Sequence, residues 1–180
     1  DLRLLIKVGA CDALDGGLNR PQLLWSLDTS PRENISAPAA RHGGALLTEH
    51  RQLPALRDYD AVRKRRDAWA LLGFCLDAHP MTLHAQELKR FRLVRSTDLA
   101  QFVGKQVLMA GMYTTGKPVR TVKEEPMQFA TFDDGHGLIE TVLFPDVYGK
   151  RGHVLFDQGP FLIRGKVEEE FGAITVTVLG

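Results

Sequence analysis

The chain has 180 residues, which is enough for one domain of ordinary size or two small ones. Its composition, 44% hydrophobic and 25% charged, is typical of a soluble globular protein, and no apolar run approaches the roughly 20 residues that span a bilayer. The only two cysteines, Cys11 and Cys75, lie too far apart for a metal motif or a disulfide framework, which favours a reducing, cytoplasmic setting. No signal peptide is visible, and the start on Asp1 rather than Met leads us to expect a fragment or a processed form.

The net charge of +1 is unevenly distributed. Between Arg51 and Arg95 there are 10 Lys and Arg against 5 Asp and Glu, a balance of +5. From Lys105 to Gly180 there are 8 against 10, a balance of −2. Any basic surface is therefore expected ahead of the C-terminal segment rather than on it.

The N-terminal segment, residues 1–27, is predicted to form two short helices. Apolar residues recur at helix spacing over 2–8, and the glycine that follows suits a C-cap. Gly16 and Gly17 form a turn, and Asn19 is the expected N-cap of a second helix over 22–27. Two helices joined by a glycine-containing turn are typical of a helix-hairpin-helix element.

The middle of the chain divides into a linker and a helical connector. Residues 28–56 are rich in Pro, Gly, Ser and Ala and are predicted to be a linker. Residues 57–104 are predicted to be helical, with an interruption that includes His79-Pro80, which we interpret as the end of a helix. The connector carries the densest basic run of the chain: Arg63, Lys64, Arg65 and Arg66.

From Lys105 the pattern changes to β-strands. Five are predicted, over 106–113, 127–132, 138–144, 161–169 and 173–179. Gly111 suits a bulge in the first strand, and residues 133–137 form a tight glycine-containing turn between the second and third. The longer break lies between the third and fourth strands, which is the layout of an OB-fold. The predicted fold class is α+β: an N-terminal helical segment with part of a helix-hairpin-helix element, then a five-stranded OB-fold β-barrel over 105–180.

Three blocks of sequence, in order, resemble segments of the C-family bacterial DNA polymerases. Residues 5–14 with 19–25 are similar to their helix-hairpin-helix region. Leu72-Gly-Phe-Cys-Leu-Asp-Ala-His-Pro80 is similar to a characteristic block of that family, and residues 129–134 with 137–146 are similar to its OB domain. The resemblance implies a C-terminal portion of the polymerase III alpha subunit or of its error-prone relative, which are DNA-directed DNA polymerases (nucleotidyltransferases).

The resemblance also carries implications for chemistry and partners. In that family the catalytic palm, with its metal-binding aspartates, lies upstream, so the parent enzyme would use Mg while this portion would hold no catalytic residue, metal or cofactor. The implied partners are single-stranded and primer-template DNA, together with other polymerase subunits, and no membrane. Replicative members usually carry a clamp-binding peptide of the type Gln-x-x-(Leu/Met)-Phe, and residues 28–71 show no match. This departure argues against clamp binding and favours the error-prone branch, although the replicative branch stays open.

Phe129 is the leading candidate for nucleic-acid binding. An aromatic side chain on the open face of such a barrel stacks on a base, which contributes roughly 1–3 kcal/mol. Strand alternation puts Phe129 and Phe132 on opposite faces, so at least one of them belongs to the core. The alternative is that Phe129 is buried as well, in the core or against a neighbouring domain.

Cations are the second set of candidates. Lys117, Arg120 and Lys123 are expected in the loop between the first two strands, which flanks the binding groove of OB-folds. Arg164 and Lys166 share one face of the fourth strand, where they would follow a nucleic-acid backbone. Solvated surface positions are the alternative for both groups.

The helical part supplies the remaining candidates. Arg63, Lys64, Arg65 and Arg66 would neutralise duplex phosphates, unless they form an ordinary solvated helix face. The turn residues Gly16, Gly17 and Asn19 would offer backbone N–H groups to phosphate.

The sequence thus predicts a non-catalytic, DNA-binding portion of a polymerase that supports synthesis in replication or translesion repair. Its OB domain would hold the single-stranded template, and its helical part would lie near duplex DNA. The alternative is a protein-interaction module that docks a partner from a polymerase or mutagenesis complex, which the charge of −2 over 105–180 favours. A third option, the anticodon-binding barrel of a class II tRNA synthetase, does not account for the helical blocks.

Overall fold

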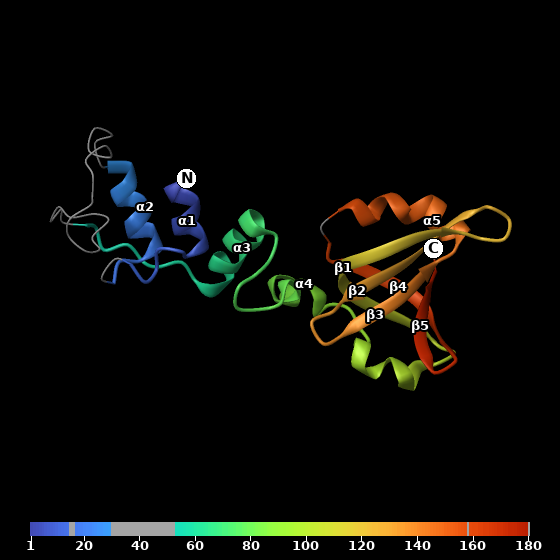
Figure 1. Cartoon of the computed structure of the whole chain (residues 1–180). Helices are drawn as coiled ribbons and strands as arrows, with labels where there is room; N and C mark the ends of the chain where they lie inside the picture. The colour runs from blue at the N-terminus through green and yellow to red at the C-terminus, as the bar shows by residue number, and fades with distance from the viewer. Residues whose placement is uncertain (15–16, 30–52, 158, 180) are drawn as a thin grey trace. The chain divides into compact units, whose positions relative to one another are not determined.

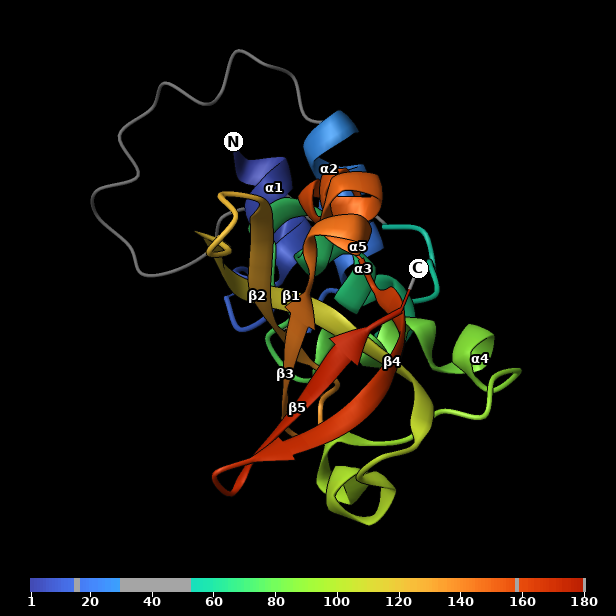
Figure 2. The same ribbon diagram turned by 90° about the vertical axis from the view of Figure 1, so that its right-hand side faces the viewer.

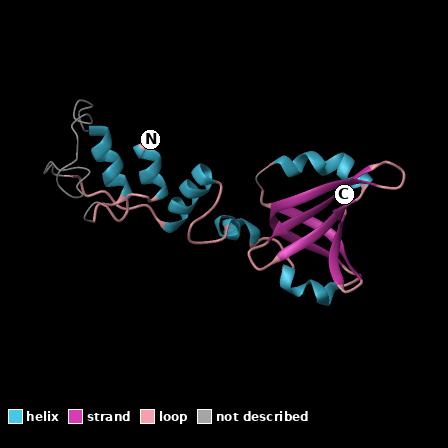
Figure 3. Cartoon of the chain, in the orientation of Figure 1, coloured by secondary structure: helices cyan, strands magenta, loops and turns pink. Residues whose placement is uncertain are grey.

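The computed structural model describes residues 1–14, 17–29, 53–157 and 159–179. The chain forms two compact units, Asp1–Ala78 and His79–Gly180. Helices make up the first unit, and all five strands lie in the second (Figures 1 and 3). The boundary falls inside the predicted connector 57–104, and the division of the chain into four segments stays a prediction. No helix among the described residues is long and apolar enough to cross a membrane.

The first two helices, α1 (Leu2–Val8) and α2 (Arg20–Thr29), begin and end on local signals. Gly9 ends α1 in the left-handed conformation, with φ of 89°, as its sequence position predicts. Asn19 caps α2: its Oδ1 accepts from the backbone N–H of Gln22, and Gln22 Oε1 accepts from the backbone N–H of Asn19, both at 3.0 Å. The reciprocal pair confirms the N-cap and starts α2 at Arg20 rather than Gln22.

A buried arginine joins the two helices. Arg20 is 9% exposed, and its guanidinium donates to the Asp12 carboxylate at 2.7–3.2 Å and to the Lys7 carbonyl at 2.9 Å. The hydrogen bonds to Asp12, which outweigh the effect of burial, raise the pKa of Arg20 above its ordinary value. Ile6, Cys11 and Leu23 form the small buried core of this element. The third helix, α3 (Ala61–Leu72), contacts α1 and ends at Gly73.

The second unit is a closed barrel of five strands: β1 (Gln106–Arg120), β2 (Pro126–Asp133), β3 (Leu138–Leu143), β4 (Phe161–Glu170) and β5 (Ala173–Val178). They close in the order β1-β2-β3-β5-β4, with β3 and β5 parallel and the other neighbours antiparallel. Helix α5 (Pro145–Arg151) and the 3-10 helix η4 (Gly152–Phe156) fill the break between β3 and β4 (Figure 1). The predicted α+β class and OB-like layout are confirmed.

The first strand is longer than its sequence suggested. β1 pairs with β4 over Gln106–Gly111 and with β2 over Met112–Arg120, so the strand predicted to end at Tyr113 continues for seven more residues. The register shift lies between Tyr113 and Thr115 rather than at Gly111, which sits where β1 changes partner. Pairing with β2 extends this strand through a stretch whose own alternation is weak.

Inward-facing residues of all five strands fill the barrel. The core holds Met109, Phe132, Ile139, Val167 and Val176, which are all nearly or fully buried. Phe132 packs edge-on against Tyr113 and Phe161, with ring centroids 5.7 Å apart in both pairs. The 3-10 helix η3 (Ser96–Phe102) adds Leu99 to this core. Figures 1 and 2 show η3 at one end of the barrel and α5 at the other.

The segment that precedes β1 is fastened to the barrel by polar contacts. The 3-10 helix η2 (Pro80–His84) is followed by α4 (Ala85–Leu88). His79 caps the start of η2, because its Nδ1 accepts from the Met81 N–H at 3.3 Å, while its Nε2 lies 3.4 Å from Asp133 Oδ1. The interpretation of His79-Pro80 as the end of a helix is therefore wrong: the pair begins one.

Candidate nucleic-acid interface

Phe129 lies on the outer surface of the barrel. It is 45% exposed on β2, whereas Phe132, three residues later, is 2% exposed in the core. The predicted division of the two rings between opposite faces is confirmed, and core burial of Phe129 is excluded. Its role in binding stays a prediction.

Backbone pairing places Phe129 in a row of residues that crosses the strands. Lys117 of β1 pairs with Phe129, Phe129 with Val142 of β3, Val142 with Thr177 of β5, and Thr177 with Lys166 of β4. We call these five residues the outer row. Directly opposed residues of antiparallel strands have Cβ atoms about 4.5–5.5 Å apart, so the row runs from strand to strand across the sheet, with the buried Val142 in its middle.

Apolar side chains surround Phe129 on this face. Met127, two residues before it on β2, and Val142, its partner on β3, share its outward phase but are buried. Phe144, one residue beyond β3, has extended backbone angles and is 46% exposed. One step past the Gln128–Leu143 pair, the register would put Phe144 diagonally across from Phe129, where it adds a second exposed aromatic. Sequence reasoning missed Phe144, although its spacing from Val142 indicates the same face.

The cations predicted for the first loop lie elsewhere. Lys117 and Arg120 are on β1 itself, and only Lys123 lies in the turn at 121–125, because β1 pairs with β2 up to Arg120. All three are exposed. Arg120 contacts Glu124, with its NH1 3.6 Å from Oε2 and 3.1 Å from the backbone oxygen. Lys117 thereby becomes the cation nearest to Phe129 in backbone register.

Of the two cations predicted on β4, Lys166 lies in the same row as Phe129 and Arg164 does not. Both are exposed and share a face, as predicted, and Lys166 belongs to the outer row. Lys166 Nζ lies 3.2 Å from Glu168, whose pKa is lowered by the hydroxyl of Thr177 and by Lys166. Arg164 instead pairs with Leu108, nine residues before Lys117 on β1, which is roughly 30 Å along an extended strand.

The basic run on α3 is largely neutralised within its own unit. Three cations form ion pairs: Arg63 with Asp67 at 3.3 Å, Lys64 with Asp58 at 2.6 Å, and Arg65 with Asp77 at 3.1 Å. Arg63 also lies over the Tyr59 ring at 4.9 Å. Arg66 is exposed and has no ion pair with any residue that the structure describes.

The turn between α1 and α2 offers fewer donors than predicted. Gly16 lies outside the described residues, and Gly17 is exposed with φ of 105°. The backbone N–H of Asn19 already donates to Gln22, and its side-chain Nδ2 donates to the Leu56 carbonyl at 2.6 Å. Asn19 is therefore occupied by its own chain.

Two turns carry fully exposed apolar side chains that sequence reasoning did not select. Val122 lies in the β1–β2 turn, and Phe171, which is 101% exposed with φ of 51°, lies in the β4–β5 turn. Figures 1 and 2 show these turns on the same side of the barrel, toward its two ends. The sequence did contain a signal for Phe171, because an aromatic residue between Glu170 and Gly172 in a predicted turn is expected to be exposed.

No metal site is evident in the part of the chain that the structure describes, where no three His, Cys, Asp or Glu side chains gather to hold an ion.

A closed five-stranded barrel with a helix between its third and fourth strands defines the OB-like class, which uses the second and third strands and the flanking loops to bind oligonucleotides or oligosaccharides.

No family model matches the chain. The polymerase III alpha subunit of Halalkalibacterium halodurans is 29% identical over 178 residues, covering 92% of this chain and 15% of that protein. The error-prone DNA polymerase of Bdellovibrio bacteriovorus is 27% identical over 195 residues, covering 96% and 17%.

A further relative, the error-prone DNA polymerase of Symbiobacterium thermophilum, is 27% identical over 69% of this chain and 12% of its own length. The chain thus spans between 12% and 17% of these three polymerases. The chain is similar to one portion of the DNA polymerase III alpha subunits and error-prone DNA polymerases, and the predicted resemblance is confirmed. A Klebsiella pneumoniae lipoprotein described as nucleic acid-binding has 16% identity, a TM-score of 0.38 and coverage of 53% of this chain and 87% of its own, a likeness too low to support an argument.

Proposed function

We propose that this chain is a non-catalytic, DNA-binding portion of a bacterial DNA polymerase, whose barrel holds single-stranded template on the face around Phe129. The observation that carries the proposal is the exposure of Phe129 on β2, with Lys117 beside it in register. Nucleotidyl transfer would then come from the rest of the polymerase, in replication or translesion repair. The names of the relatives support the polymerase assignment.

The chemistry of this face suits a stacked single strand. Phe129 and Phe144 each expose an aromatic surface on which a base can stack without regard to its identity. Lys117 supplies a cation for a phosphate next to the stacked base. The segment 105–180 as a whole carries a net charge of −2, so we expect stacking to contribute more than charge, and the rest of the polymerase to contribute to holding the DNA.

The helical unit would lie near duplex product. Arg66 is the cation of the α3 run that is free to meet a phosphate, because its three neighbours in the run are paired. The α1–α2 element would approach the duplex through the turn that contains Gly17. Partner subunits would dock on other surfaces of the parent protein.

Fluorescence anisotropy with a labelled 20-residue oligodeoxythymidine tests the barrel face. Phe129→Ala should weaken binding by roughly 1–3 kcal/mol, because a stacking surface is lost. Phe156→Ala is the matched control, since Phe156 is an exposed aromatic on η4, outside β1, β2 and β3. Equal affinities of the two variants, or unfolding of the Phe129 variant, would remove the support for this face.

The second candidate function is docking of a protein partner. The specific observation is Phe171, a fully exposed aromatic that follows Glu168, Glu169 and Glu170 at the tip of an acidic hairpin. The carboxylates beside this tip would repel the phosphates of nucleic acid. The exposed ring and the carboxylates together suit a protein surface that is basic and partly apolar. If Phe171→Ala abolishes capture of a purified partner subunit while oligonucleotide binding is unchanged, the protein-interaction function is supported.

A further inference from the structure

The barrel unit carries a basic segment that is separate from every site residue discussed above. Lys89, Arg90, Arg92 and Arg95 are four exposed cations within seven residues, and we call them the basic strip. None of them forms an ion pair within the described ranges. Lys89 donates to Gln86 Oε1 at 3.1 Å, and Arg90 donates to the Glu87 carbonyl at 2.9 Å, so all four positive charges remain uncompensated.

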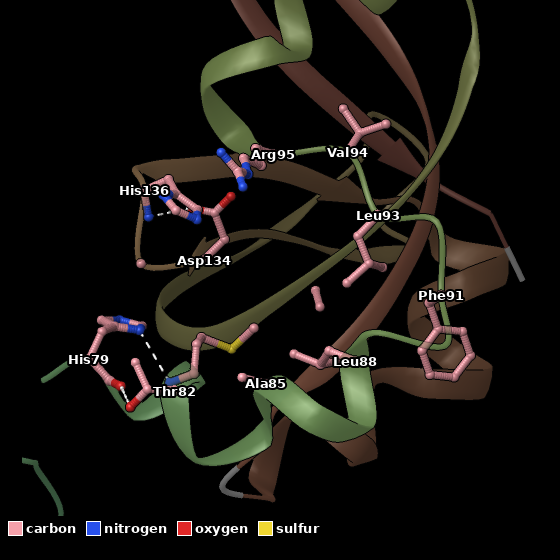
Figure 4. Close-up of a pocket in the computed structure, with 13 residues that line it drawn as sticks. His79, Thr82, Ala85, Leu88, Phe91, Leu93, Val94, Arg95, Asp134 and His136 are labelled. Atoms are coloured by element: carbon pink, nitrogen blue, oxygen red, sulfur yellow. Dashed lines mark hydrogen bonds between the residues drawn. The ribbon is translucent and has the colours of Figure 1, made fainter.

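Arg95 of the basic strip lines a pocket of about 410 Å³ within the second unit, as do Phe91 and Leu93, which lie between the strip's cations in sequence. Figure 4 shows Leu88, Leu93 and Phe91 on one side of it, and His79, Asp134, His136 and Arg95 on the other. The Arg90 guanidinium lies 5.9 Å from the centre of the Phe91 ring, which is itself partly exposed. The pocket therefore joins an apolar wall to a polar one that includes Arg95.

Hydrogen bonds at Val94 and Ser96 anchor the C-terminal end of the strip to the barrel. The Val94 N–H donates to the Leu108 carbonyl of β1 at 2.9 Å. Asp134 accepts from the Ser96 N–H at 2.7 Å and from its hydroxyl at 2.9 Å, and also from the N–H groups of His136 and Gly137. Both carboxylate oxygens of Asp134 are thus engaged by its own chain. Because these contacts exist without a ligand, a ligand would meet a preformed surface at this end of the strip.

We propose that the basic strip and its pocket form a second site for single-stranded nucleic acid, with phosphates along the strip and one base in the pocket. The inference takes its class of ligand from the proposed function but rests on different residues. Cations without carboxylate partners attract a polyanion. A flat base with polar edges suits a pocket that is apolar on one side and polar on the other, and stacking on Phe91 and Arg90 is available at its mouth.

The second site lies away from Phe129. Val94 bonds to Leu108, whereas Phe129 pairs with Lys117, and these two positions on β1 are nine residues apart. A long oligonucleotide that reaches both sites would gain affinity from their linkage, although each site binds separately.

The charge of the strip is tested with Arg92→Gln/Arg95→Gln, using anisotropy on the labelled 20-residue oligodeoxythymidine at several salt concentrations. Neither side chain has a hydrogen bond in the described structure that the change would break. Affinity at low salt should fall roughly tenfold, and the slope of log K against log salt should shrink by roughly 1.4, because two phosphate contacts on a single strand are lost. Lys150→Gln/Arg151→Gln, which removes two exposed cations of α5, is the matched control and should bind like the unmodified chain.

The pocket is tested with Ala85→Phe, which places a ring at an exposed lining position of α4. Binding should weaken at least threefold with the salt slope unchanged, because a base is displaced but no cation is lost. Ala100→Phe, at an exposed position of η3 outside the pocket, is the control and should have no effect. Equal binding by these two variants would overturn base insertion.

The outcomes separate this site from the barrel face. If Arg92→Gln/Arg95→Gln binds like its control while Phe129→Ala is weakened, the second site is wrong and the proposed function stands. If the arginine variant is weakened and Phe129→Ala is not, the second site stands and the barrel face is wrong. Failure of the unmodified chain to bind at low salt overturns both, and strip-dependent binding of a labelled polyglutamate peptide in place of oligodeoxythymidine would show that the strip takes an acidic protein segment instead.

Discussion

The two basic segments of this chain differ in what surrounds their cations. Arg63–Arg66 on α3 is the denser run, yet three of its four side chains are paired with Asp58, Asp67 and Asp77. The basic strip, at Lys89, Arg90, Arg92 and Arg95, has no such partner in the described structure. A carboxylate of the same chain competes with a phosphate for its cation, so the availability of a positive charge matters more than its density.

The largest expected effect concerns the contacts that hold the strip in place. Asp134→Ala should lower the free energy of unfolding of the barrel unit by about 2–3 kcal/mol, because charge-assisted hydrogen bonds to Ser96 and to the turn are lost. Trp25 and Trp69, the only tryptophans, both lie in the first unit. In urea unfolding, far-UV circular dichroism should therefore show the loss while tryptophan fluorescence does not.

Asp157→Ala, at an exposed carboxylate that follows η4, serves as the control and should change the stability by less than about 0.5 kcal/mol. A transition that moves equally in both signals would contradict the independent response expected of the barrel unit.

The next largest effect is expected from a variant that frees the cations of α3 from their carboxylate partners, as those of the basic strip already are. Asp58→Asn/Asp67→Asn/Asp77→Asn removes the partners of Arg63, Lys64 and Arg65. Affinity for oligodeoxythymidine at low salt should rise roughly tenfold, and the salt slope should steepen by up to about 2, because three cations become available. The control is Asp146→Asn/Asp157→Asn/Glu169→Gln, which makes the same change in net charge. Its three carboxylates lie in the barrel unit and form no ion pair among the described residues. An equal rise in both variants would mean that net charge, rather than freed cations, controls binding.

A smaller effect concerns pH. Burial acts to raise the pKa of Asp134, but hydrogen bonds from Ser96, His136 and Gly137 outweigh it, so the pKa lies below its ordinary value. A lowered pKa means that ionised Asp134 stabilises the fold above the ordinary carboxyl pKa of about 4, and that this contribution is lost as pH falls through the folded pKa. The stability difference between the unmodified chain and Asp134→Asn, about 1 kcal/mol near pH 7, should narrow in acid. A stability difference that stays constant down to about pH 2 would contradict a stabilising role for ionised Asp134.

The smallest effect separates the two basic segments one residue at a time. Arg65→Ala breaks an exposed pair with Asp77 and should cost less than about 0.5 kcal/mol of stability. Arg65→Ala should change the affinity for the oligonucleotide less than twofold. Arg92→Ala should lower that affinity roughly threefold, because one phosphate contact is lost. If Arg65→Ala weakens binding as much as Arg92→Ala does, intramolecular pairing does not distinguish the segments.

Local signals predicted the parts of the fold that depend on neighbours in sequence. Gly9 as a C-cap, Asn19 as an N-cap and the turn at 133–137 are each specified within a few residues. The second half of β1 was missed because its glycine, lysine and proline residues show no apolar alternation, and its pairing with β2 is what extends it. The basic strip was missed because its cations are interleaved with Phe91, Leu93 and Val94, which dilutes the charge.

The sequence by itself determined the number of strands, the opposite faces of Phe129 and Phe132, and the resemblance to polymerases. These follow from the period-two geometry of a strand and from the order of three blocks, and both are local properties of the chain. Only the tertiary structure decided which cations are free, because Arg65 meets Asp77 twelve residues away. It also decided where the pocket forms, because Asp134 meets Ser96 across 38 residues, and contacts at such separations leave no periodic trace in a sequence.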